Sequence, residues 1–125
     1  MKIEVSHAEI VDKLTILEIK KNNITSVEKL KNIVSEFDYL KSVVEKYLGI
    51  STESPEYVEL LKVNKELWDI EENIREKERK KEFNDSFVQL ARSVYFVNDK
   101  RAEIKKEINL KYFSTFIEEK SYKPY

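Results

Sequence analysis

The chain has 125 residues, of which 41% are hydrophobic and 38% are charged, and its formal net charge is −1. This length is typical of one domain, residues 1–125. A near-neutral charge provides no long-range attraction for nucleic acid or anionic lipid, so we expect neither as a partner. Because the sequence contains no cysteine, disulfides, thiolate metal sites and thiol catalysis are excluded.

Targeting and membrane signals are also missing from the pattern of hydropathy. No apolar run approaches the roughly 20 residues that a membrane span requires. The N-terminal segment lacks the continuous apolar core of a signal peptide. We therefore expect a soluble protein in the cytoplasm, without a membrane partner.

Breakers of regular structure are scarce, since the chain has one glycine and two prolines. Together with abundant Glu, Lys, Leu and Ile, this scarcity favours a few long helices joined by short turns. We predict an all-α fold of about four helices in an antiparallel bundle, with a long helical hairpin at the C-terminal end. After a short extended segment, the helices are expected near residues 7–22, 26–48, 55–82 and 86–118, followed by an irregular tail at 119–125.

Start and stop signals support these boundaries. The strings SHAE and TSVE fit the capping box, in which a hydroxyl and a Glu three residues later satisfy free N–H groups. Proline suits the first helical position, and glycine suits the end of a helix. The expected caps are Ser6 and Thr25 for the first two helices, Gly49 at the end of the second, Ser54 with Pro55 for the third, and Asn84 or Asp85 for the fourth.

The predicted fourth helix carries an amide and two cations on its apolar stripe. On a helical wheel Asn98, Arg101 and Lys105 fall on the line that joins Val94 to Ile108. Burying a charge without a partner costs several kcal/mol. These side chains therefore need either acidic partners on other helices or a ligand.

Acidic residues in similarly unfavourable positions would supply such partners. Asp12 and Glu18 fall between apolar positions of the first helix, and Glu71 lies beside Arg75 between two apolar groups of the third. The candidate polar cluster or anion-binding site comprises Asp12, Glu18, Glu71, Arg75, Arg92, Asn98, Arg101 and Lys105.

Two interpretations of this cluster stay open. In the first, the charges form an interhelical network, and the chain is a non-enzymatic interaction module that binds a second copy or another protein. In the second, the cations line a pocket for an anionic metabolite, Asn98 orients the ligand, and Asp12 or Glu71 holds the cations or acts as a base. A network gives each polar group a protein partner, whereas a site arranges the cations around a cavity.

We expect no cofactor and no metal, and whether the chain is an enzyme stays open. The single histidine, His7, falls in the first helical turn and has no second ligand nearby in sequence. The strings EYVE and ELWD resemble the magnesium motifs of helical pyrophosphohydrolases, but both fall on one helix in an acid-rich chain. The string AEIVDKLTILEIKK resembles the first helix of helical chorismate mutases, but it lacks their ligand-binding arginine.

Four longer strings carry a broader resemblance. They are DKLTILEIK, LWDIEENIREKERKKEF, LARSVYFVNDKRAEIKKEIN and EEKSY. Together they resemble a family of small, uncharacterised bacterial and phage helical proteins, a domain of unknown function. The resemblance covers most of the chain except the segment between residues 27 and 66, and it implies no particular activity.

Overall fold

The computed structural model describes residues 1–125 as four α-helices and one short π-helical turn, with no strand. The all-α prediction is therefore confirmed. In chain order the elements are α1 (His7–Asn23), α2 (Val27–Val43), η1 (Val44–Leu48), α3 (Pro55–Arg79) and α4 (Asp85–Lys111). None of the helices combines the length and the hydropathy that a membrane span needs.

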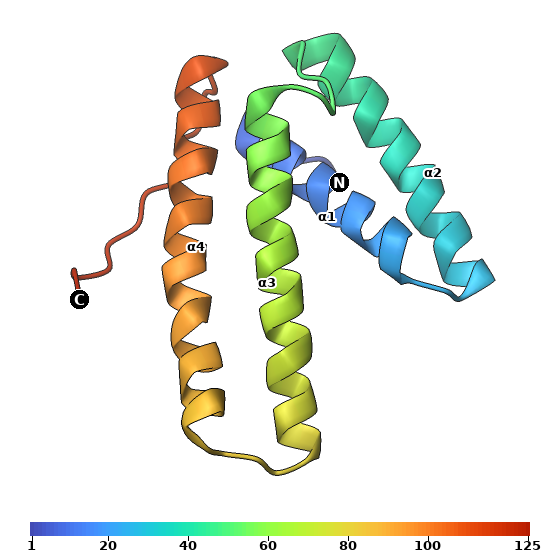
Figure 1. Cartoon of the computed structure of the whole chain (residues 1–125). Helices are drawn as coiled ribbons and strands as arrows, with labels where there is room; N and C mark the ends of the chain where they lie inside the picture. The colour runs from blue at the N-terminus through green and yellow to red at the C-terminus, as the bar shows by residue number, and fades with distance from the viewer.

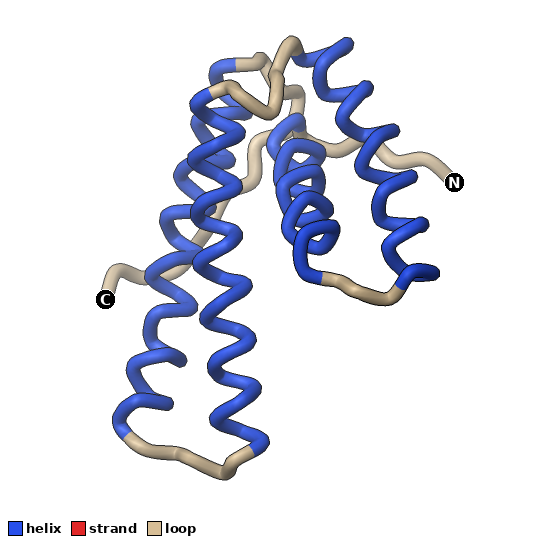
Figure 2. The backbone as a smooth tube through the Cα atoms, turned by 45° about the vertical axis from the view of Figure 1, so that its right-hand side comes forward, coloured by secondary structure: helices blue, strands red, loops and turns tan.

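The long helices α3 and α4 form an antiparallel hairpin, as predicted, and α1 packs across one half of it (Figure 1). Figure 2 shows that the other half of the hairpin extends beyond α1 and α2. Helix α1 contacts both α3 and α4, whereas α2 contacts only α1 and η1. The chain thus has a three-helix contact region and a two-helix extension.

The buried core lies where α1 covers the hairpin. Its largest fully buried apolar side chains are Leu14 of α1, Tyr57 and Leu60 of α3, Ile108 of α4, and Ile50 from the loop after η1. No residue between positions 65 and 96 is buried. The apolar residues of the hairpin extension are therefore at most partly buried, although Leu67 and Ile70 pack against the edge of the core.

Several cap predictions are confirmed. The Ser6 hydroxyl accepts a hydrogen bond from the Glu9 N–H at 3.3 Å, and the Asn84 side chain accepts one from the Phe87 N–H at 3.1 Å. Gly49 ends the η1 turn with a φ of +67°, in the left-handed region that favours glycine. These contacts satisfy free backbone groups within one turn of each cap.

One cap position needs correction, and one correctly placed cap lacks its hydrogen bond to the helix. The N-cap of α2 is Ser26 and not Thr25, and its hydroxyl accepts from the Lys29 N–H at 3.5 Å. Ser54 does precede α3, but its hydroxyl accepts from the Ser51 N–H at 2.9 Å and makes no bond to the helix. Adjacent hydroxyl residues compete for one cap, and the path of the incoming loop selects between them.

The predicted fourth helix was too long, because α4 ends at residue 111 and not near 118. Phe113 takes a φ of +55°, and the Ser114 N–H donates to the Asn109 carbonyl at 2.8 Å, which closes the helix end. The Asn109 side chain then accepts from the Ala8 N–H at 2.9 Å, and the Ser114 hydroxyl accepts from the His7 N–H at 3.1 Å. The end of α4 thus supplies hydrogen-bond acceptors for two free N–H groups at the start of α1.

Candidate functional site

A buried carboxylate joins three helices at the centre of the fold. Asp12 of α1 is 3% exposed. Arg101 of α4 donates to it through two nitrogens, from Nε to Oδ1 at 3.0 Å and from Nη2 to Oδ2. Asn64 of α3 donates from Nδ2 to the same Oδ1 at 2.8 Å. We call these three residues the Asp12 clamp.

Local hydrogen bonds support the clamp. The Thr15 hydroxyl accepts from Asn64 Nδ2 at 2.7 Å and donates to the Asp12 carbonyl at 2.7 Å. The hydrogen bond to Asp12 raises the pKa of Arg101 above its usual value, and burial of the guanidinium opposes this effect only in part. Charge-assisted bidentate pairs of this kind hold both side chains in one geometry. The clamp therefore sets the register of α1 against the hairpin.

A second ion-pair group lies one helical turn along α4. Lys105, whose side chain is 11% exposed, places its Nζ 2.6 Å from Glu9 Oε1 and 3.4 Å from Glu118 Oε2. Glu118 also pairs with Lys120 at 2.7 Å. Hydrogen bonding to Lys120, followed by the charge of Lys105, lowers the pKa of Glu118. The C-terminal segment is thereby attached to α4.

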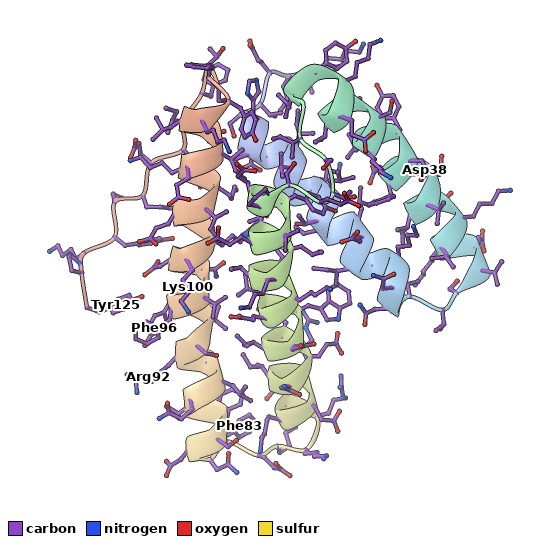
Figure 3. All side chains as sticks on the ribbon, turned by 45° about the horizontal axis from the view of Figure 1, so that its top comes forward. Asp38, Phe83, Arg92, Phe96, Lys100 and Tyr125 are labelled. Carbon is purple, nitrogen blue, oxygen red and sulfur yellow. The ribbon has the colours of Figure 1, made fainter.

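A cavity of about 510 Å³ lies between α4 and this C-terminal segment. The tail returns along the outer side of α4 (Figure 1). The Tyr125 hydroxyl donates to Asp99, and its ring lies 5.1 Å from that of Tyr95 and 4.8 Å from that of Phe96. Figure 3 shows Tyr125 beside Phe96 on this side of α4. The charged residues that line the cavity are Arg101, Lys105, Lys120 and Lys123, against Asp99 and Glu118.

Four of the predicted site residues meet in this region. Arg101 is in the clamp with Asp12, and Lys105 lies beside it on α4. Asn98 lines the same cavity as the two cations, although its side chain is exposed and makes no hydrogen bond. The cations therefore meet both tests: they have protein partners, and they line a cavity.

The other four predicted residues lie outside this group. Glu71 and Arg75 are exposed and pair with each other at 3.8 Å, and they line a separate hollow of about 460 Å³ that Arg101 also reaches. Arg92 is exposed, with its guanidinium carbon 6.0 Å from the Phe96 ring centre. Glu18 is half-buried and pairs with no cation.

Glu18 instead affects a buried tyrosine. The Tyr57 hydroxyl is fully buried and has no hydrogen-bond partner of ordinary geometry. Burial raises the pKa of Tyr57 well above its usual value, and the neighbouring Glu18 carboxylate raises it further. This pair lies apart from the Asp12 clamp and the cavity.

Several residues of the region are missing from the sequence-based set. Asn64 does lie between apolar positions of α3, which is the signal that could have placed it in the clamp. Glu9 was not predicted to pair with Lys105, because the capping box already accounts for a Glu at that position. Glu118 was not predicted to contact Lys105, because a helix that continues to residue 118 would carry it away from Lys105. The residues that sequence reasoning missed are Glu9, Thr15, Asn64, Asn109, Glu118, Lys120 and Lys123.

A protein-family model of unknown function, DUF6165, matches residues 1–125, which is the whole chain. The chain belongs to the DUF6165 family. The resemblance to a domain of unknown function is thus confirmed at that level. No curated protein and no solved structure matches the chain. The family assigns no chemistry, so the function of this DUF6165 domain has to be argued from its residues.

The single histidine of this DUF6165 domain contacts the end of α4. His7 Nδ1 lies 3.0 Å from the Tyr112 carbonyl oxygen. No group of three or more His, Asp or Glu side chains is arranged to hold a metal ion. The candidate functional features are therefore the Asp12 clamp, the ion pairs of Lys105 and the cavity beside α4.

Proposed function

We propose that this DUF6165 domain is a non-enzymatic interaction module that pairs with a second copy of itself through the hairpin extension, residues 65–96. The observation that carries the proposal is that no residue of this extension is buried. The extension nevertheless has apolar residues at helical spacing, namely Leu67, Ile70, Ile74, Phe87, Leu90 and Val94. Helical stability depends mainly on packing such a stripe against a neighbour.

In the other half of the hairpin, the neighbour that covers α3 and α4 is a helix, α1. There α1 covers the two-helix face, and the Asp12 clamp holds α1 in place. Because each polar side chain of the clamp has a protein partner, the clamp supports a structural role in this proposal. Two extensions packed face to face would make a four-helix bundle and continue the same layer.

Charge along α3 and the turn that follows it supports an antiparallel pairing of two copies. Residues 66–72 contain four carboxylates and no cation, whereas residues 75–81 contain five cations and two carboxylates. A twofold axis near residue 73 would set the acidic stretch of each copy against the basic stretch of the other. Since a twofold axis repeats each contact, the attraction would act twice. The basic stretch of each copy would thus have an acidic partner on the other copy.

Sedimentation or light scattering after size exclusion tests this proposal. We expect the wild type to be a dimer that weakens as salt is raised. Reversing the acidic stretch with Glu71→Lys and Glu72→Lys, or the basic stretch with Arg79→Glu and Lys80→Glu, should each give monomers. An equimolar mixture of the two variants should form a one-to-one complex, because both pairs of stretches are complementary again.

A matched control lies on α2, outside the proposed interface. The double change Lys29→Glu and Lys31→Glu, at exposed positions, changes the net charge by the same amount as Arg79→Glu with Lys80→Glu. It should leave the dimer intact. A wild type that stays monomeric at low salt would refute the proposal, as would variants that remain separate on mixing. The cytoplasmic location expected from the sequence is part of the same proposal.

A second candidate function is binding of an anionic metabolite. It is favoured by a different observation, the cavity of about 510 Å³ on which Arg101, Lys105, Lys120 and Lys123 converge. The wall itself carries four cations and two carboxylates, and Asp12 and Glu9 beside it offset the charges of Arg101 and Lys105. The proposed interface and this cavity use different residues, apart from Tyr95 on α4, so the two functions are compatible.

A further inference from the structure

We infer that the cavity between α4 and the C-terminal segment takes an aromatic phosphate, such as a nucleoside monophosphate, whose phosphate replaces the Glu118 carboxylate. The inference rests on the second candidate function and adds the ligand class and the mode of entry. Three features of the cavity carry it: free donors, an internal anion and a tyrosine-lined wall.

The cavity wall contains donors that the protein itself leaves unused. Arg101 gives Nε and Nη2 to Asp12, and its Nη1 makes no hydrogen bond. The Asn98 amide makes no hydrogen bond, and Lys123 makes no ion pair, although both line the cavity. Donors that come from separate directions suit a tetrahedral phosphate with several oxygens better than a planar carboxylate.

Asp12 holds the arginine ready for such a ligand. Because the carboxylate binds one edge of the guanidinium, the Arg101 side chain is held in one geometry beside the cavity, and its Nη1 is held with it. Pre-organisation of this kind reduces the ordering cost of binding. The same contact that sets the register of α1 therefore also positions a donor.

Glu118 already occupies the anion position. Its carboxylate lies 2.7 Å from Lys120 Nζ and 3.4 Å from Lys105 Nζ, and it lines the cavity. It belongs to the irregular segment after α4, so it can leave without any helix unfolding. A phosphate with two charges would bind the two lysines more strongly than one carboxylate does.

The remaining wall is aromatic. Tyr95 of α4 and Tyr122 and Tyr125 of the tail line the cavity. Aromatic side chains can stack on the planar ring of any nucleobase. The volume of about 510 Å³ lies within the roughly 300–1,000 Å³ of small-molecule sites. One cavity therefore offers both a phosphate position and a stacking surface.

Calorimetric titration of the full chain with AMP tests the inference, with adenosine and inorganic phosphate as partial ligands. We expect AMP to bind more tightly than either part. Lys123→Met should weaken AMP binding about tenfold, as expected for loss of one charge-assisted contact. Glu118→Gln should still bind AMP, because the phosphate can bridge Lys105 and Lys120 in place of the lost carboxylate. Lys100→Met, an exposed cation of α4 outside the cavity wall, is the matched control and should change nothing.

Each result separates the ligand class from the site. If inorganic phosphate and AMP bind equally, the aromatic part of the inference is wrong and the anion site stands. If neither they nor other nucleoside monophosphates bind, the inference and the second candidate function both fail. If AMP binds the wild type but not Glu118→Gln, replacement of the carboxylate by the phosphate is wrong.

Discussion

Removal of the guanidinium from the Asp12 clamp tests whether the polar seam holds the fold together. Arg101→Met keeps an unbranched apolar stem of similar reach and removes all the donors. Asp12, which is 3% exposed, would then keep one hydrogen bond, from Asn64 to Oδ1 at 2.8 Å. Its Oδ2 would be left without a partner in the protein.

The cost follows from burial of the charge that remains. Removing one partner of a buried ion pair costs about 3–5 kcal/mol, because the other charge stays uncompensated. The Arg101 side chain is 28% exposed, so water can reach the gap, and we expect about 2–4 kcal/mol. At about 4 °C per kcal/mol for a domain of this size, Tm should fall by about 8–16 °C.

Thermal and urea unfolding followed by circular dichroism would measure this change. The double variant Asp12→Asn, Arg101→Met removes both charges and should recover at least about 1 kcal/mol of the loss. Lys100→Met, an exposed neighbour on α4, should stay within about 0.5 kcal/mol of wild type. If Arg101→Met melts within a degree or two of wild type, Asp12 is solvated after the change, and the clamp is not structural.

Two further predictions concern shifted pKa values. The pKa of Glu118 is lowered from 4.5 by Lys120 and Lys105, so its attachment of the tail should be complete above pH 4.5 and be lost as the pH falls through the lower folded value. Protease cleavage within residues 115–125 should rise over that range in wild type, whereas Glu118→Gln should be cleaved at neutral pH already. Tyr57→Phe removes a buried hydroxyl without a partner and should leave stability unchanged or raise it by up to about 1 kcal/mol. A loss of stability in chemical denaturation would instead show that Glu18 accepts a hydrogen bond from this hydroxyl.

The helices and the polar positions on them could be predicted from the sequence because their signals are local. Ser6, Gly49 and Asn84 cap their helices through bonds that span three to five residues. Likewise, Arg101 and Lys105 interrupt an apolar stripe that helical periodicity alone defines. Such features depend on backbone geometry within one turn, so no knowledge of the packing is required.

Tertiary structure decided which of these groups meet. Several carboxylates were available to Arg101, and the crossing of α1 over the hairpin selects Asp12, together with Asn64, and leaves Glu71 at the surface. Helix periodicity continues past residue 111, yet α4 ends there, and Asn109 of its last turn and Ser114 just beyond it accept from the free N–H groups of Ala8 and His7. That ending turns the following segment back along α4 and forms the cavity, a result of contacts between residues about 100 positions apart.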